Sequence, residues 1–140
     1  GEVAVSGVLG GVGGGAAVAA KLGATVRFIE SDWFAAVGAA RFDFIVSNPP
    51  YIAADDPHLP ALAHEPRQAL VSGADGLHDI RRIIAAAPEH LAPGAWLLLE
   101  HGWDQAAAAR ALLSDSGWAQ VQSRRDLAGV ERCSGGQWPL

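Results

Sequence analysis

The sequence predicts an α/β fold built around a largely parallel sheet. Three observations favour it: short apolar runs alternate with helix-forming stretches, these runs lack a regular polar alternation, and a long polar excursion follows one of them. With 140 residues, half of them hydrophobic, the chain is long enough to bury one core. Ligands of such folds bind where the carboxyl ends of the strands meet.

Four apolar runs predict strands. They are Val3–Val5, Thr25–Ile29, Phe42–Ser47 and Ala95–Glu100. Because the strands of a parallel sheet are covered by helices on both sides, we expect these runs to be buried on both faces. The segment from Ile52 to Gly76 is rich in Pro, Ala, Asp and His, and we expect it to cross the carboxyl edge of the sheet as a functional loop.

Two helices are predicted in the second half of the chain. Apolar residues recur at helical spacing from Ile80 to Leu91, and Pro93-Gly94 is expected to end this helix. The second helix is expected over Asp104–Ser116, with Gly117 just beyond its end.

A terminal hairpin is predicted after the second helix. Its strands are expected at Ala119–Arg125 and Val130–Cys133, on either side of a turn at Ala128-Gly129.

Composition argues against several classes of protein. The longest strongly apolar run, Ala95–Leu99, is far shorter than the roughly 20 residues of a membrane span, so we expect no membrane association. A net charge of −5 argues against nucleic acid as the main partner. No pair among His58, His64 and His101 has zinc-ligand spacing, so we expect no metal site. The lone Cys133 fits a reducing compartment, and we expect a cytoplasmic protein.

A glycine-rich stretch near the N-terminus has two interpretations. Gly11–Ala16 fits the G-x-G-x-x-A pattern of a dinucleotide-binding loop, and Glu30 follows at a suitable distance. However, so dense a run of glycines matches almost any glycine template. Each glycine inside a helix also costs about 1 kcal/mol relative to alanine, so a poorly formed helix is the competing interpretation. A nicotinamide-binding domain therefore stays an alternative.

The stretch Asn48-Pro49-Pro50-Tyr51 follows the third apolar run directly. Its prolines fix φ, favour extended backbone before them and have no N–H to compete for nearby carbonyl oxygens. Asn48 adds a side-chain acceptor, and Tyr51 adds a flat ring. Such a site suits a planar NH2 group whose nitrogen is a poor nucleophile and must be positioned for alkylation. A proline-rich loop that merely ends a strand is the competing interpretation.

Four separated motifs carry a resemblance to a known family. They read SDWFAAV to RFDFIVSNPPYI, HLPALAHEPRQALVSGADGLHDIRRII, LAPGAWLLLEHGWDQ and DLAGVERC. Together they resemble the bacterial release-factor glutamine methyltransferases, the PrmC/HemK family. The resemblance covers residues 21–133 of a partial catalytic domain spanning 1–140, and residues 1–20 are a divergent glycine-rich segment. Glu65–Leu70 and Leu99–Gly102 favour this family over DNA and RNA adenine methyltransferases, which share Asn-Pro-Pro-Tyr.

The resemblance implies methyl transfer from S-adenosylmethionine to the glutamine side-chain amide in the Gly-Gly-Gln motif of peptide chain release factors. Asn48 and the Pro49 carbonyl are implied as the catalytic acceptors of the amide hydrogens, and Pro50 and Tyr51 complete the substrate site. Release factors are the expected partners, and nucleic acid is not expected as a direct substrate.

The resemblance also implies cofactor-binding residues. Asp32 is implied at the polar edges of the adenine, Trp33 over one of its faces, and Asn48 between cofactor and substrate.

The N-terminal part departs from the family pattern. The family's first strand and glycine loop lie farther from Asn-Pro-Pro-Tyr than the 47 residues that precede it here. We therefore expect a class I, Rossmann-like methyltransferase fold that is N-terminally truncated, with Val3–Val5 as the second strand and Ser6 in place of the ribose-binding carboxylate. Val3–Val5 and Thr25–Ile29 should then lose their link to Phe42–Ser47, unless another segment fills the gap.

This departure has a consequence for cofactor binding. The chain alone is expected to bind S-adenosylmethionine poorly or not at all. An adenine-amino methyltransferase acting on nucleic acid and a non-catalytic remnant of the family are the alternative functions.

Gly135-Gly136-Gln137 repeats the tripeptide that the family modifies, and we interpret it as a chance match in a C-terminal tail.

Overall fold

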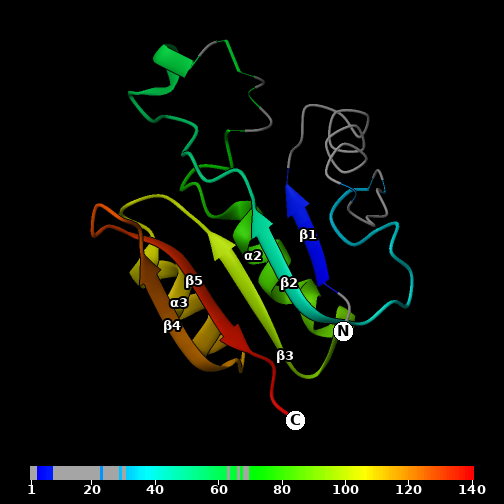
Figure 1. Cartoon of the computed structure of the whole chain (residues 1–140). Helices are drawn as coiled ribbons and strands as arrows, with labels where there is room; N and C mark the ends of the chain where they lie inside the picture. The colour runs from blue at the N-terminus through cyan, green and yellow to red at the C-terminus, as the bar shows by residue number, and fades with distance from the viewer. Residues whose placement is uncertain are drawn as a thin grey trace.

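A five-stranded mixed sheet organises the chain (Figure 1). The computed structural model describes residues 3–7, 23, 29, 31–62, 64–65, 67 and 70–140. The strand order is β1-β2-β3-β5-β4, in which β1, β2 and β3 are parallel and β5 is antiparallel to both its neighbours. The strands are β1 Val3–Gly7, β2 Phe42–Asn48, β3 Leu91–Glu100, β4 Ala119–Arg125 and β5 Glu131–Gln137.

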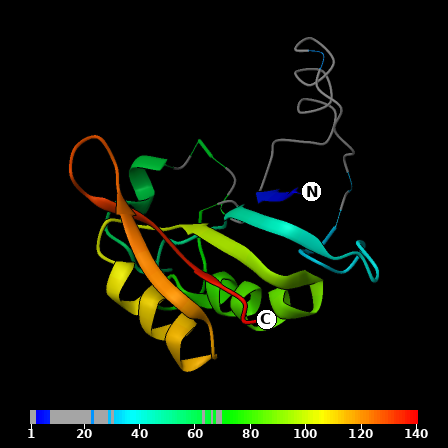
Figure 2. The ribbon, with the colours of Figure 1, turned by 60° about the horizontal axis from the view of Figure 1, so that its bottom comes forward.

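Both α-helices of the described part pack on the same face of the sheet. These are α2, His78–Ala86, which lies between β2 and β3 in the chain, and α3, Ala106–Asp115, which follows β3. Figure 2 shows both on one side of the strands. The core lies between these layers and includes Ile80, Ile83, Ile84, Leu113, Ile45, Leu97 and Leu99. Neither helix, nor any other in the described part, is long and apolar enough to cross a membrane.

The other face of the central strands is less covered. Phe44 and Val46 of β2, and Trp96 and Leu98 of β3, are half-buried. The residues that alternate with them toward the carboxyl ends are buried: Ile45, Ser47, Ala95, Leu97 and Leu99. The prediction that these strands are buried on both faces is therefore wrong for β2 and β3, because both described helices cover one face.

The edge beside β2 is occupied by β1. The two strands pair in parallel from Val3 opposite Phe44 to Gly7 opposite Asn48. The prediction that Val3–Val5 would lose its link to Phe42–Ser47 is therefore wrong, because Val3–Gly7 itself pairs with this strand and satisfies backbone groups that would otherwise form an open sheet edge. The Gly11–Ala16 stretch and the predicted strand at Thr25–Ile29, apart from its last residue, lie outside the described residues.

The first predicted helix ends earlier than expected. α2 ends at Ala86, the 3-10 helix η3 (Ala87–His90) follows with a proline in its first turn, and β3 begins at Leu91. Pro93-Gly94 lies inside β3, so the prediction that it ends the helix is wrong. Gly94 has φ +79°, and its N–H donates to the Trp138 carbonyl (N···O 3.0 Å), so the C-terminal segment holds this part of the strand.

The second helix and the hairpin are confirmed. Gly117 follows α3 in the left-handed conformation, with φ +87°. The hairpin turn closes where the Gly129 N–H donates to the Asp126 carbonyl (3.0 Å), with Gly129 at φ +81°.

Gly135-Gly136-Gln137 lies within β5, so the prediction of a tail is wrong. A Cβ atom at Gly135 would lie 2.3 Å from the Leu97 carbonyl oxygen, and the Gln137 amide donates to the Gly94 carbonyl (2.9 Å). These residues therefore serve the pairing of β5 with β3.

Candidate functional site

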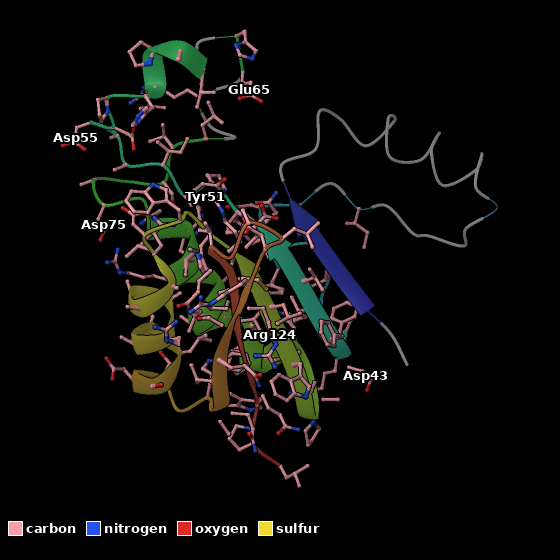
Figure 3. The ribbon with its side chains drawn as sticks, turned by 60° about the vertical axis from the view of Figure 1, so that its left-hand side comes forward. Asp43, Tyr51, Asp55, Glu65, Asp75 and Arg124 are labelled. Atoms are coloured by element: carbon pink, nitrogen blue, oxygen red, sulfur yellow. The ribbon has the colours of Figure 1, made fainter. Side chains whose placement is uncertain are left out.

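The Asn-Pro-Pro-Tyr motif lies at the carboxyl end of β2. Asn48 ends the strand with an exposed side chain, Pro49 and Pro50 are buried, and Tyr51 is half-buried. Figure 3 shows Tyr51 at this end of β2 and Asp43 at the other. An exposed amide therefore lies next to two buried prolines and a half-buried ring.

The residues after the motif close a loop on the same edge. The Ile52 N–H donates to the Leu70 carbonyl, and the Ser72 N–H donates to the Ile52 carbonyl, both over 2.9 Å. Ile52 thereby forms a parallel bridge with Val71. The loop between these bonds, on which Asp55 and Glu65 lie, projects beyond the sheet (Figure 3).

This loop encloses an open cavity of about 500 Å³. Apolar side chains, three carboxylates and one guanidinium line it: Ala54, Asp55, Asp56, Leu59, Pro60, Leu62, Glu65, Arg67 and Leu70. Arg67 Nη2 donates to the Ala54 carbonyl over 3.4 Å, a contact that joins two parts of the loop. The exposed His58 ring bonds Asp56 (Nδ1···Oδ1 3.0 Å) within the same loop.

Gln105 connects the motif to the end of β3. Its Nε2 donates to the Tyr51 carbonyl (2.8 Å), and its Oε1 accepts from the Gly102 N–H (2.8 Å). This contact was not predicted, because it joins residues 54 apart in sequence. The available signal was that the third family-like motif ends at Gln105.

A buried hydrogen-bond network holds the turn that contains Gly102. His101 is fully buried, with Nδ1 2.9 Å from the Gly102 carbonyl and Nε2 2.7 Å from Ser134 Oγ. A carbonyl can only accept, so Nδ1 carries the proton and Nε2 accepts from the serine. His101 therefore ties the turn after β3 to β5.

The network continues to the hairpin. Ser134 Oγ lies 2.7 Å from Ser123 Oγ, to which Arg110 donates over 2.6 Å. Arg110 also pairs with Glu131 (2.6 Å) and holds the pKa of that carboxyl below its usual value. Polar contacts thus run from the surface of the hairpin to the end of β3.

The two residues implied at the cofactor contact α2. Asp32 pairs with Arg82 (3.2 Å), and its side chain remains 71% exposed. Trp33 Nε1 donates to Asp79 Oδ1 (3.2 Å). Trp33 also has φ +51°, a left-handed conformation that is rare for a bulky residue. This turn lets the indole reach the first turn of α2.

Asp79 joins the Trp33 side of the site to the motif side. Its Oδ2 accepts from Ser72 Oγ (2.7 Å), and its N–H donates back to the same oxygen (2.7 Å). Since the Ser72 N–H bonds the Ile52 carbonyl, a continuous set of bonds leads from Trp33 to the residue after Tyr51. Sequence reasoning missed Asp79 and Ser72, because both look like ordinary helix-start residues.

Neither a metal nor a reactive thiol marks the described part of the site. Its His, Cys, Asp and Glu side chains nowhere gather in a group of three or more that could hold a metal ion. Cys133 is half-buried in β5, and burial raises the pKa of its thiol. The residues of the motif at this edge offer amide, carbonyl and aromatic groups.

Curated relatives match most of the chain. It is 55% identical over 123 residues to the release factor glutamine methyltransferase of Burkholderia pseudomallei, covering 86% of this chain and 43% of the relative. It is 56% identical over 115 residues to that of Pseudomonas aeruginosa, covering 81% and 42%. The chain thus spans less than half the length of these relatives. No family model matches it.

Solved structures share the fold. A protein-(glutamine-N5) methyltransferase, release factor-specific, from Alicyclobacillus acidocaldarius is 27% identical with a TM-score of 0.55, covering 99% of this chain and 79% of that one. A methyltransferase from Pyrococcus furiosus has a TM-score of 0.70 at 17% identity, covering 99% and 62%. The predicted class I, Rossmann-like methyltransferase fold is confirmed.

Proposed function

Because this chain belongs to the family of release factor glutamine methyltransferases and matches the C-terminal part of its relatives, we propose that its Asn48–Tyr51 motif is the acceptor site for methyl transfer to a glutamine. The donor is S-adenosylmethionine. The acceptor is the side-chain amide nitrogen in the Gly-Gly-Gln motif of peptide chain release factors. The observation that carries this proposal is the exposed Asn48 amide beside two buried prolines at the end of β2.

The acceptor residues perform positioning rather than covalent catalysis. The Asn48 side-chain oxygen and the Pro49 carbonyl accept the two amide hydrogens, and the Tyr51 ring packs on the amide plane. Pro50 has no N–H, so it does not compete for an acceptor. Holding both N–H bonds aims the nitrogen lone pair and stabilises the positive charge that develops there.

The described residues fit the adenosyl end of the cofactor. Asp32 offers an exposed carboxylate to polar edges, and the half-buried Trp33 offers a flat face. S-adenosylmethionine, when bound, would supply an electrophilic methyl group and leave as a neutral thioether, and the methylated amide nitrogen would release one proton to water. Asn48 would lie between this group and the glutamine.

Release factors are the proposed protein substrates, and the cytoplasm is the proposed compartment, since translation ends there. The loop after Tyr51 supports a protein substrate, because its open cavity leaves room for residues that flank the glutamine.

A methylation assay tests the proposal. The chain is incubated with a release factor, or with DNA or RNA, and millimolar methyl-labelled S-adenosylmethionine. We expect label in the Gly-Gly-Gln peptide and none when that glutamine is replaced by alanine. Label on adenine would support the nucleic-acid alternative. Absence of label from every substrate would contradict methyl transfer by this chain.

A further inference from the structure

We propose that Gln105 is a positioning residue that clamps the Tyr51 carbonyl and thereby sets the geometry of the acceptor site, an inference that rests on the proposed function. The side-chain amide acts both as a donor and as an acceptor. Its Nε2 donates to the Tyr51 carbonyl, and its Oε1 accepts from the Gly102 N–H, each over 2.8 Å. A carbonyl needs a donor and an N–H needs an acceptor, so one orientation of the amide satisfies both partners. Gln105 is also only 9% exposed, so water competes little for these bonds.

Two glycines leave the space in which the clamp fits. A Cβ atom at Gly76 would lie 2.3 Å from the Tyr51 carbonyl oxygen and 2.9 Å from Gln105 Nε2. A Cβ atom at Gly102 would lie 3.2 Å from Gln105 Oε1 and 3.4 Å from Tyr51 Cδ2. The backbone therefore approaches the bridging amide from two sides, and the Tyr51 carbonyl has little freedom to move away.

The clamp is anchored on a rigid part of the fold. Gly102 follows the fully buried His101, whose ring bonds both the Gly102 carbonyl and Ser134 of β5. Gln105 itself directly precedes α3. The Tyr51 carbonyl is thus held in a fixed position relative to the sheet and to α3, as a precisely arranged site requires.

The effect on the acceptor site follows from the stiffness of the motif. Pro49 and Pro50 have fixed φ, so few backbone rotations remain between Tyr51 and the Pro49 carbonyl to absorb a shift at Tyr51. Gln105 also donates a hydrogen bond to the Tyr51 carbonyl oxygen, so this oxygen is already bonded. The substrate amide is thereby directed to the Asn48 and Pro49 oxygens. Gln105 does not contact the substrate in this arrangement.

Gln105→Glu separates positioning from bulk packing, because the two side chains have almost the same shape. The carboxylate can still accept from Gly102, but it faces the Tyr51 carbonyl with a second acceptor. Protonation restores a donor toward Tyr51, so the defect should reverse at low pH. Gln122→Glu is the matched control, since Gln122 is a half-buried glutamine of β4 whose side chain donates to the Gln120 carbonyl (3.0 Å) in an exposed bond.

The full chain is compared with both variants at pH 7.5 and pH 5. Nuclear magnetic resonance titration gives the affinity for a Gly-Gly-Gln peptide, and thermal unfolding gives stability. We expect Gln105→Glu to bind the peptide about 10-fold more weakly at pH 7.5, the effect of one hydrogen bond turned into a repulsion, and to recover most of this loss at pH 5. Gln122→Glu should match the wild type at both pH values.

Two results would overturn the clamp. One is equal behaviour of the two variants at both pH values, and the other is a loss of stability in Gln105→Glu without a loss of peptide affinity. If the wild-type chain does not bind the peptide, the proposed function fails for this chain. The clamp is then decided by the Gln105 side-chain NH2 signals: slow hydrogen exchange supports it, and exchange as fast as that of the Gln122 NH2 group contradicts it.

Discussion

The acceptor side and the Asp32–Trp33 side of the proposed site are built in different ways. The Asn48–Tyr51 motif follows a strand that is paired on both edges, and a buried amide and a backbone bridge hold its far end. Asp32 and Trp33 reach α2 through one exposed ion pair and one half-buried hydrogen bond. An exposed ion pair contributes at most about 1 kcal/mol, whereas buried bonds resist local opening.

The difference teaches which part of the chemistry the fold fixes in advance. A poor nucleophile must be oriented closely, so its acceptors lie where strands, helix and prolines restrict movement. The Trp33 side joins this frame through Asp79 and Ser72, so its position follows that of the acceptor side. The predictions below test this contrast.

The largest effect is expected at the acceptor itself. Asn48→Ala should lower the rate of release-factor methylation by about 10²- to 10³-fold, the usual loss when one charge-stabilising contact is removed. Thermal unfolding should change little, because the side chain is exposed. Rates are measured with labelled cofactor at millimolar concentration. Gln122→Ala, which removes a half-buried amide of β4 outside the motif, is the control, and an Asn48→Ala variant that retains its activity would contradict the assigned role.

The second effect concerns the fold around the motif. Gly76→Ala should lower the free energy of unfolding by roughly 3 kcal/mol, because the added Cβ meets the Tyr51 carbonyl and φ is +77°. Gly117→Ala is the control: it has a similar φ of +87°, and nothing lies within 4 Å of its Cβ position, so about 1 kcal/mol is expected. Urea denaturation measures both, and equal losses would show that the close approach is unimportant.

The third prediction weighs the cofactor side. Calorimetry on the chain should show S-adenosylmethionine affinity weaker than micromolar, because Asp32 and Trp33 are held only by one exposed ion pair and one half-buried hydrogen bond. A Gly-Gly-Gln peptide should still perturb the nuclear magnetic resonance signals of Asn48 and Tyr51. Micromolar cofactor binding would remove the proposed contrast between the two sides.

The smallest effect is a pH dependence beside the acceptor side. Arg81 donates to Asp75 (Nη1···Oδ1 3.1 Å) and lowers the pKa of that carboxyl from 3.8 to about 2. A lowered pKa means that the stabilisation is present above about pH 4 and is lost as the pH falls toward 2. Arg81→Met should flatten the stability profile over this range. Arg124→Met, which removes a donor to the Ser123 carbonyl, should leave its slope unchanged in unfolding experiments from pH 2 to 5.

Local patterns predicted those parts of the fold that depend on local rules. The apolar run before Asn48 predicted β2, and Gly117 and Gly129 marked a helix end and a turn. The end of α2 was misplaced because Pro93-Gly94 looks like a helix stop. The deciding interaction, between Gly94 and Trp138, joins residues far apart in sequence.

The candidate site divides along the same line. The place of Asn48–Tyr51 at a strand end could be predicted, because the apolar run directly before it forms β2. The chemistry proposed for the motif stays a prediction. Gln105, Asp79 and His101 act through partners between 7 and 54 positions away, and their neighbours in sequence do not indicate these contacts. Topology supplies these partners, and no single motif records them.

The strand β5 contains a Gly-Gly-Gln sequence that is paired inside the sheet. Gly135-Gly136-Gln137 has the sequence that the proposed reaction recognises, yet its backbone pairs with β3 on one side and β4 on the other. The Gln137 side-chain NH2 group donates to the Gly94 carbonyl. Recognition of a Gly-Gly-Gln motif thus depends on its conformation as well as on its sequence, so a chain can contain this tripeptide without being its own substrate.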